Sequence, residues 1–284
     1  MKLGAHQSIA GGFLTSIRLA EEDGCEALQI FTKVANQWRE PVIDAATARP
    51  FRAGVKRLRL APVLSHASYL VNLCSDDGTT RARSIDSLAR ELRRCETLGI
   101  PYVVLHPGAP KGQGEESGIE LIAAGLDAAY TQVDADGAVA ARVLLESTAG
   151  QGSTLGRTFE QLAEILRRAR CADRLAFCLD TCHLLAAGYD WTTEQGYAEV
   201  FGAFDRILGF DRLLAFHLND SKKGLGSRLD RHEWIGDGAI GLEPFRRLVR
   251  DRRFARLPGV LEIPPRDDER GYRENLRRLR ELLG

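Results

Sequence analysis

Histidine or carboxylate residues close six short apolar segments of this 284-residue sequence, each near the point where the apolar run stops. Imidazole and carboxylate groups are the side chains that bind zinc and other divalent transition metals. If the six segments are strands whose ends meet, these side chains form a shared metal site. The six residues are His66, His106, Glu146, Asp180, His217 and Glu262.

Three further donors lie close to these residues in the sequence. In GSRLDRHEWIGDG (226–238), Asp230 and His232 are separated by one residue, so in an extended loop both side chains leave on the same side. His183, three residues after Asp180, can complete a second group with them. Five histidines and four carboxylates are too many for one tetrahedral zinc, and they suit two or three ions that share a bridging carboxylate.

We expect structural roles for the remaining histidine and for the cysteines. His6 ends the first apolar segment, and we expect it to pack structurally, with a place just outside the metal site as the alternative. Cys178 and Cys182 flank Asp180, and buried packing is favoured over ligation for both. The six cysteines lack a C-x-x-C pair or disulfide-scaffold spacing, which predicts reduced and mostly buried thiols.

The charge balance argues against a general attraction to anions but allows a local one. The chain has 39 basic and 39 acidic residues, and this zero net charge argues against broad electrostatic attraction to nucleic acid. The four carboxylates of the predicted site alone give a charge of about −4, and three divalent ions would change it to about +2. A phosphodiester therefore becomes a plausible ligand once metal is bound.

The elements that must position these residues follow from the hydrophobic pattern. Eight segments rich in Val, Leu, Ile and Phe alternate with amphipathic stretches such as 80–99 and 157–170. The apolar segments are near-continuously hydrophobic, as in parallel strands covered on both faces. This pattern predicts an α/β fold, with one (β/α)8 TIM-barrel domain over residues 1–284. In such a barrel the carboxyl ends of the strands converge on the catalytic face.

Neither a signal peptide nor a membrane-length apolar segment is found, so we expect a cytoplasmic protein without membrane contact. No P-loop pattern is present, and no nucleotide cofactor is expected. We also expect a monomer.

Nine motifs resemble the endonuclease IV family of apurinic/apyrimidinic endonucleases, which are zinc-dependent barrel enzymes of base-excision repair. The similarity runs from end to end, and its long, ordered motifs make it specific. The motifs are GAHQSIAGG (4–12), FTK (31–33) with Gln37-Trp38, HASYLVNL (66–73), HPG (106–108), LESTAGQGS (145–153), DTCHLLAAGYD (180–190), HLNDSK (217–222), GSRLDRHEWIGDG (226–238) and LEIPP (261–265).

The resemblance implies a trinuclear site with about three Zn²⁺ per chain, although Mn²⁺ and Fe²⁺ use the same ligand types. Glu146 is implied to bridge two ions and to be the central catalytic residue. The implied ligands of the first ion are His66, His106 and Glu146, those of the second are Glu146, Asp180, His217 and Glu262, and those of the third are His183, Asp230 and His232.

By the same resemblance, the substrate is double-stranded DNA that contains abasic sites or blocked 3′ ends. Hydrolysis 5′ to the lesion would leave a 3′-hydroxyl and a 5′-deoxyribose phosphate. Tyr69 and Leu70 would wedge at the lesion, with Asn36 where the family often carries Arg. The residues expected to contact DNA phosphates are Lys33, Arg39, Lys111, Lys222, Lys223, Arg228 and Arg231.

Two alternatives stand beside this interpretation. A metal-dependent sugar isomerase or epimerase of a related barrel would use similar strand-end ligands, but such enzymes usually need one or two ions. The Asp230–His232 loop favours phosphodiester cleavage. A catalytically silent damage-binding protein would have no need for a bridging carboxylate.

Overall fold

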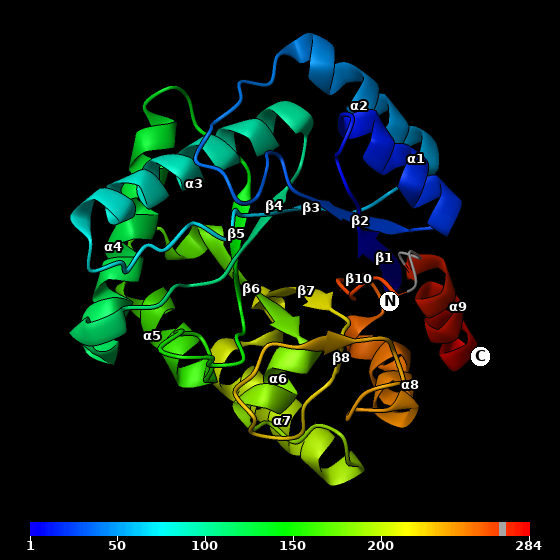
Figure 1. The fold of residues 1–284 in the computed structure, drawn as a ribbon. Coiled ribbons are helices and arrows are strands. Elements are labelled where there is room, and N and C mark those ends of the chain that lie inside the picture. Colours follow the sequence, from blue (N-terminus) through cyan, green and yellow to red (C-terminus); the bar gives the residue numbers. More distant parts are fainter. Residues whose placement is uncertain (267–270) are drawn as a thin grey trace.

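The computed structural model describes residues 1–266 and 271–284, in which eight parallel strands form a closed barrel (Figure 1). Around the barrel the order is β1-β2-β3-β4-β5-β6-β7-β10, with β10 closing onto β1. The predicted TIM-barrel architecture is therefore confirmed. The strands are β1 (Lys2–His6), β2 (Ala27–Ile30), β3 (Val63–His66), β4 (Tyr102–Leu105), β5 (Arg142–Glu146), β6 (Leu175–Asp180), β7 (Leu213–His217) and β10 (Pro258–Leu261).

Helices surround the barrel (Figure 1). The predicted stretch 80–99 corresponds to α3, which starts slightly earlier because the side chain of Asp77 caps its first backbone N–H groups. The α-helices are α1 (Phe13–Asp23), α2 (Ala45–Leu58), α3 (Gly78–Leu98), α4 (Glu115–Asp134), α5 (Phe159–Arg168), α6 (Thr181–Ala187), α7 (Glu194–Leu208), α8 (Leu242–Arg250) and α9 (Tyr272–Leu283). Short 3₁₀ turns are η1 (Lys111–Gln113), η2 (Ala172–Arg174), η3 (Phe210–Arg212) and η4 (Arg252–Phe254).

The barrel interior is filled by aliphatic side chains, and this filling determines where polar side chains point. A separate buried cluster inside the barrel contains Leu64, Val104, Leu144, Ala176, Cys178, Ala215 and Val260. Successive strand residues point to opposite faces, so the residue two positions further along also faces inward. Position i+2 from Leu64, Val104 and Leu144 is His66, His106 and Glu146. The same step leads from Cys178, Ala215 and Val260 to the other three predicted strand-end ligands.

One close backbone approach requires glycine in β1. A Cβ built on Gly4 would lie 2.0 Å from the carbonyl oxygen of Ala27 in β2. Any larger residue there would push the two strands apart.

A second, larger apolar core lies between the barrel and its helices. All six cysteines are free thiols, and five of them are buried; Cys25 is partly exposed. Among the described residues, no helix combines the length and the apolar character that a membrane span needs. An antiparallel pair, β8 (Asp220–Ser221) and β9 (His232–Glu233), lies beyond the end of β7 and brackets the loop between them.

Candidate metal centre

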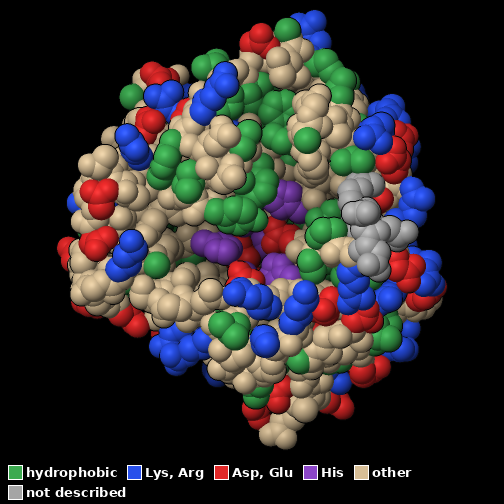
Figure 2. Space-filling model, in the orientation of Figure 1, with side chains coloured by type: hydrophobic (Ala, Val, Ile, Leu, Met, Phe, Trp, Pro, Cys, Tyr) green, Lys and Arg blue, Asp and Glu red, His purple; other side chains and the backbone are tan. Residues whose placement is uncertain are grey.

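Histidine and carboxylate side chains gather at the carboxyl ends of the strands, in a hollow at the centre of the face shown in Figure 2. Besides a group that includes Cys182, their donor atoms form three groups of histidines and carboxylates, each with atoms within 4.8 Å of one another. The groups are His66, His106 and Glu146; Glu146, Asp180, His217 and Glu262; and His183, Asp230 and His232. Their membership is the same as in the scheme that the sequence implies, and Glu146 belongs to two of them.

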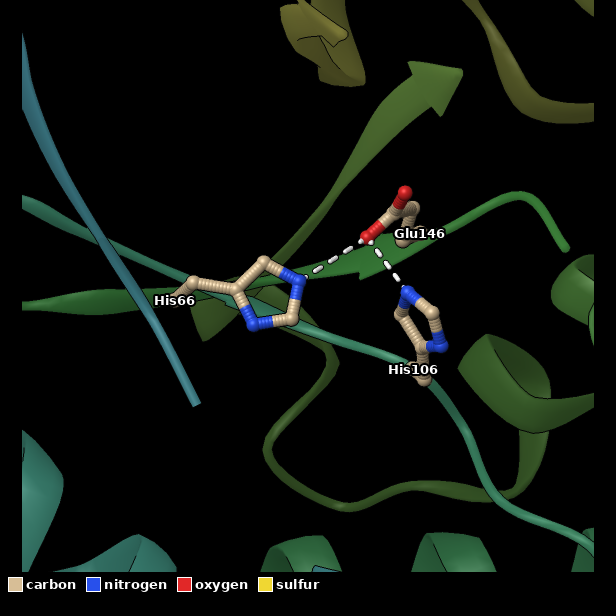
Figure 3. Close-up of side chains that lie close together, drawn as sticks. All are labelled: His66, His106 and Glu146. Atoms are coloured by element: carbon tan, nitrogen blue, oxygen red, sulfur yellow. Dashed lines mark ion pairs between the residues drawn. The ribbon is translucent and has the colours of Figure 1, made fainter. Parts of the chain in front are cut away.

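Glu146, at the end of β5, directs its two carboxylate oxygens to different partners. Oε2 lies 3.0 Å from Nε2 of His106 and 3.4 Å from Nε2 of His66 (Figure 3). Oε1 lies 2.9 Å from Nδ1 of His217. Glu146 is fully buried, so this carboxylate can serve two donor groups without contact with bulk water.

The second group combines residues at the ends of four strands, β5, β6, β7 and β10. Nδ1 of His217 lies 3.1 Å from Oε2 of Glu262 and 3.9 Å from Oδ2 of Asp180. Asn219, two residues after His217, links this group: its Nδ2 donates to Oδ2 of Asp180 at 2.6 Å, and its Oδ1 accepts from the backbone N–H of Glu262 at 2.8 Å. The carboxylate of Asp180 is therefore held by a neighbouring amide.

The third group depends on the turn from β6 into α6. Oδ1 of Asp180 accepts from the backbone N–H of His183 and so caps the helix that carries this histidine. Nε2 of His183 lies 3.2 Å from Oδ2 of Asp230, and Nε2 of His232 lies 3.2 Å from Oδ1 of the same carboxylate. The predicted chelating geometry of Asp230 and His232 agrees with these distances.

Backbone carbonyls orient three of the imidazoles. Nδ1 of His66 lies 2.7 Å from the carbonyl oxygen of Ala67, and Nδ1 of His183 lies 2.8 Å from that of Ser147. Nδ1 of His232 lies 3.0 Å from the carbonyl oxygen of Glu262. Because a carbonyl only accepts, Nδ1 carries a proton in each ring, so in the neutral ring the lone pair is on Nε2. This is how histidine ligands of metal sites are usually held.

Buried donor atoms without a hydrogen-bond partner also indicate a metal site. Within the described part of the chain, seven buried side-chain N or O atoms lack a hydrogen-bond partner, and three of them belong to the donor groups: Oε2 of Glu146, Nε2 of His183 and Nε2 of His232. Buried polar atoms normally have a partner, because leaving one unpaired costs about 1–3 kcal/mol. A bound metal ion would give these three donor-group atoms a partner.

The electrostatics of the site also favour cations. Burial opposes ionisation of Glu146, but His217 and His106 hold the pKa of this carboxyl well below its usual range. Burial likewise opposes ionisation of Asp230, yet His183 and His232 lower its pKa to about 2. Burial would lower the pKa of His183, but Asp180 and Asp230 raise it well above its usual value. The carboxylates thus remain ionised and attract positive charge.

Cys182 lies close to Asp180 and His232 and is a geometric alternative as a ligand. Burial raises the pKa of the Cys182 thiol to about 12, which leaves it neutral and a weak ligand. His6 does not simply pack against apolar neighbours: its Nδ1 lies 2.9 Å from Oε1 of Glu262, at the outer edge of the cluster.

Lys33 is placed differently from expectation. It is 4% exposed, and its ammonium donates to the carbonyl oxygen of Gln37 at 2.9 Å and to Oε1 of Glu40 at 2.5 Å. Glu40 also accepts from Arg94. These internal contacts disfavour the predicted contact of Lys33 with DNA phosphate, which stays a prediction. A lysine after an apolar strand looks the same in sequence whether it faces solvent or pairs with a carboxylate of its own loop.

The remaining predicted DNA-contact residues lie mostly at the surface. Tyr69 is 66% exposed, with its ring centroid 5.3 Å from that of Phe31 and 5.6 Å from that of His66, while Leu70 is half-buried. The exposed residues are Asn36, Arg39, Lys111, Lys222, Lys223, Arg228 and Arg231. Lys and Arg side chains border one side of the hollow in Figure 2. A pocket of about 330 Å³ next to the cluster is lined by Tyr69, Phe31, Glu262 and Tyr272, among others.

Asn219 and Asp220 are site-building residues that the sequence analysis did not single out. The carboxylate of Asp220 is fully buried and accepts from the backbone N–H groups of Ser221, Gly236, Gly238, Ile240 and Gly241. It thereby fixes the segment that follows His232. The available signal was two successive polar residues shortly after an apolar strand.

Fold and cluster together define the class of protein: a (β/α)8 barrel whose strand ends carry grouped donors able to bind metal ions. Residues 17–282 match the family model described as xylose isomerase-like TIM barrel. Over 281 residues, 99% of this chain and 94% of the relative, the sequence is 47% identical to a probable endonuclease 4 of Geobacter sulfurreducens. It is also 45% identical, over 99% of this chain and 98% of the relative, to a probable endonuclease 4 of Chloroflexus aurantiacus.

Among solved structures, endonuclease IV from Thermus thermophilus is similar to this chain, with a TM-score of 0.87, 36% identity and coverage of 100% of this chain and 99% of that one. D-psicose 3-epimerase from Clostridium cellulolyticum shares the fold alone, with a TM-score of 0.67, 15% identity and coverage of 100% and 96%. The chain belongs to the endonuclease IV family, and its prediction as an enzyme of the nuclease class is confirmed.

Proposed function

We propose that the protein is a DNA-repair endonuclease that hydrolyses the phosphodiester 5′ to abasic sites in duplex DNA, leaving a 3′-hydroxyl and a 5′-deoxyribose phosphate. The observation that carries the proposal is the set of nine donors grouped around Glu146, in a chain of the endonuclease IV family. Removal of blocked 3′ ends is part of the proposal, because it is hydrolysis of the same type of bond.

We propose Zn²⁺ for each of the three donor groups, with Mn²⁺ or Fe²⁺ able to occupy the same ligand types. When bound, such ions supply a nucleophilic water near neutral pH and offset the charge of the phosphodiester. Glu146 connects the first two groups through its two oxygens. The third group differs in that Asp230 lies on the loop between β8 and β9, and His232 on β9, rather than on a barrel strand.

The chain's own side chains would hold the DNA around this centre. Arg228 and Arg231 are exposed on the loop that carries Asp230, and are suited to contact phosphates next to the cleaved bond. Tyr69 and Leu70 directly follow His66 and would fill the gap left by a displaced nucleotide. An abasic nucleotide lacks base pairing, which lowers the cost of turning it out of the duplex.

We also propose that the protein is a cytoplasmic monomer with one domain over residues 1–284. It would act on double-stranded DNA without a nucleotide cofactor. The sugar isomerase or epimerase alternative has weaker support. It leaves the third donor group, His183, Asp230 and His232, without a role.

The test is incision of an end-labelled duplex with one abasic site, compared with the undamaged duplex of the same sequence. We expect a single cut on the 5′ side of the lesion and no cut in the control. The same preparation is assayed with D-fructose for epimerisation. Epimerisation without incision by fully metallated protein would replace the proposed function with the sugar alternative.

A further inference from the structure

Gln29 of β2 contacts two of the proposed metal ligands at once. It is fully buried, and its backbone pairs in register with Leu64, whose side chain lies inside the barrel. Its Nε2 lies 2.6 Å from Oε1 of Glu262, and its Oε1 lies 2.9 Å from Nε2 of His217. This one amide therefore joins a ligand that follows β10 to a ligand at the end of β7.

The chemistry of the contacts fixes the orientation of the amide. The carboxylate of Glu262 only accepts, so the NH₂ group of Gln29 must face it. The carbonyl oxygen of Gln29 then faces His217 and must accept the proton of Nε2. Without a metal ion Nδ1 also carries a proton, which it donates to Glu146. In the neutral ring that a metal ion requires, the proton on Nε2 leaves the lone pair on Nδ1. Nδ1 is the atom that lies 2.9 Å from Glu146 and 3.1 Å from Glu262.

His217 is held in the opposite sense to the other oriented imidazoles. His66, His183 and His232 each direct Nδ1 to a backbone carbonyl, which leaves Nε2 for a metal. His217 directs Nε2 to the side chain of Gln29, which leaves Nδ1. Every residue has a backbone carbonyl, but the partner of His217 depends on the residue type at one position.

We propose that Gln29 is a positioning residue of the metal centre. It keeps His217 in the tautomer that presents Nδ1, and it holds Oε1 of Glu262 so that Oε2 faces the second donor group. His6 completes the arrangement, since its Nδ1 lies 2.9 Å from Oε1 of Glu262 and 3.0 Å from Nε2 of Gln29. The inference rests on the proposed metal centre and adds to it a determinant of one particular ion site.

The direct test is Zn²⁺ binding by the purified full-length chain and its Gln29→Met variant. Methionine has a similar length and removes both hydrogen bonds. Partners that orient metal ligands typically contribute roughly 10–100-fold to metal affinity, so we expect a loss of this size at one ion site and little change at the others. The measurement is the number of Zn²⁺ ions retained per chain during competition with a graded series of chelators.

A second readout separates positioning from general destabilisation. In the zinc-loaded wild-type chain, the proton on Nε2 of His217 should exchange slowly and give a resolved imidazole N–H signal in NMR spectra. Gln29→Met should lose this signal. Gln29→Glu keeps an acceptor for His217 but cannot donate to Glu262, so it should retain the signal and still bind Zn²⁺ more weakly.

Gln161→Met is the matched control. Gln161 is also a buried glutamine, but its contacts are with Gly156, Arg157 and Glu115 rather than with any of the nine donors. We expect unchanged Zn²⁺ affinity in this variant. Equal Zn²⁺ affinity of wild type and Gln29→Met would overturn the inference while leaving the metal centre in place. Failure of the wild-type chain itself to bind Zn²⁺ would instead contradict the proposed centre, and the inference with it.

Discussion

Oε1 of Glu146 lies 2.9 Å from Nδ1 of His217, and both side chains are completely buried at the mouth of the barrel. The other carboxylate oxygen of Glu146 faces His66 and His106. One side chain thus stands between two sets of donors that come from different strands. This relationship makes Glu146 the residue on which the proposed multinuclear site most depends.

Replacing Glu146 with glutamine should leave a folded barrel with little activity. The amide keeps the shape but has a single acceptor oxygen and no charge, so it cannot serve two ions. Loss of an outer partner of a metal ligand already costs roughly 10–100-fold, and we expect a larger loss of incision rate here. Metal content and incision rate are measured on the same sample. Glu243→Gln, at an exposed position of α8, is the control. Near-normal turnover of Glu146→Gln would exclude the bridging role.

Zinc binding should release protons and weaken as the pH falls. The carboxylates around His183 overcome the effect of burial and raise the pKa of this imidazole well above its usual value. A raised pKa means that the ring is protonated below it, and only the neutral ring can bind a metal. Affinity should therefore rise with pH as this ring loses its proton, which happens above the ordinary histidine pKa of about 6.5. Calorimetric titrations in two buffers of different ionisation enthalpy count the protons released. Identical heats in both buffers would contradict this coupling.

Asp220→Asn should destabilise the segment that follows His232. The buried carboxylate accepts five backbone N–H groups, and an amide would turn its own N–H atoms toward some of these donors. We expect a loss of about 2 kcal/mol in the free energy of unfolding, together with weaker binding of one zinc ion. Urea denaturation and metal content are the measurements. Asp211→Asn, at an exposed position, should match the wild type.

Neutralising an exposed basic side chain should affect DNA binding, whereas neutralising a buried one should affect stability. Arg228→Gln or Arg231→Gln should reduce the slope of log affinity for abasic duplex against log salt by about one, if each contacts a phosphate. Lys33→Met should leave this slope unchanged and lower stability instead, because it breaks a buried ion pair with Glu40. A changed slope in Lys33→Met with normal stability would place this lysine on the DNA after all.

The strand-end donors could be predicted because burial makes them conspicuous. An ionisable residue such as His106 or Asp180 at the end of an apolar strand needs a reason to be there, and six such ends converge in a barrel. Gln29 escaped the same reasoning because an uncharged glutamine inside ALQIF gives no comparable signal. Its partners, His217 and Glu262, are far away in the sequence.

Whether a charged side chain is buried or exposed was harder to predict than whether it could bind a ligand. Lys33 and Arg39 belong to one loop and are both basic, yet the first is buried against Glu40 and the second is exposed. Which one pairs internally depends on where α3 places Arg94 and its neighbours, and local sequence does not encode that. The same holds for Asp220, whose five donors lie up to 21 residues away.

Reconstitution of the chelated protein with increasing Zn²⁺ tests the central claim most directly. Incision of the abasic duplex is recorded at each step together with the number of ions bound per chain. We predict negligible incision without metal and full 5′-specific incision only when all three donor groups are filled, at about three ions per chain. Full activity in the metal-free protein, or with a single ion bound, would contradict the account.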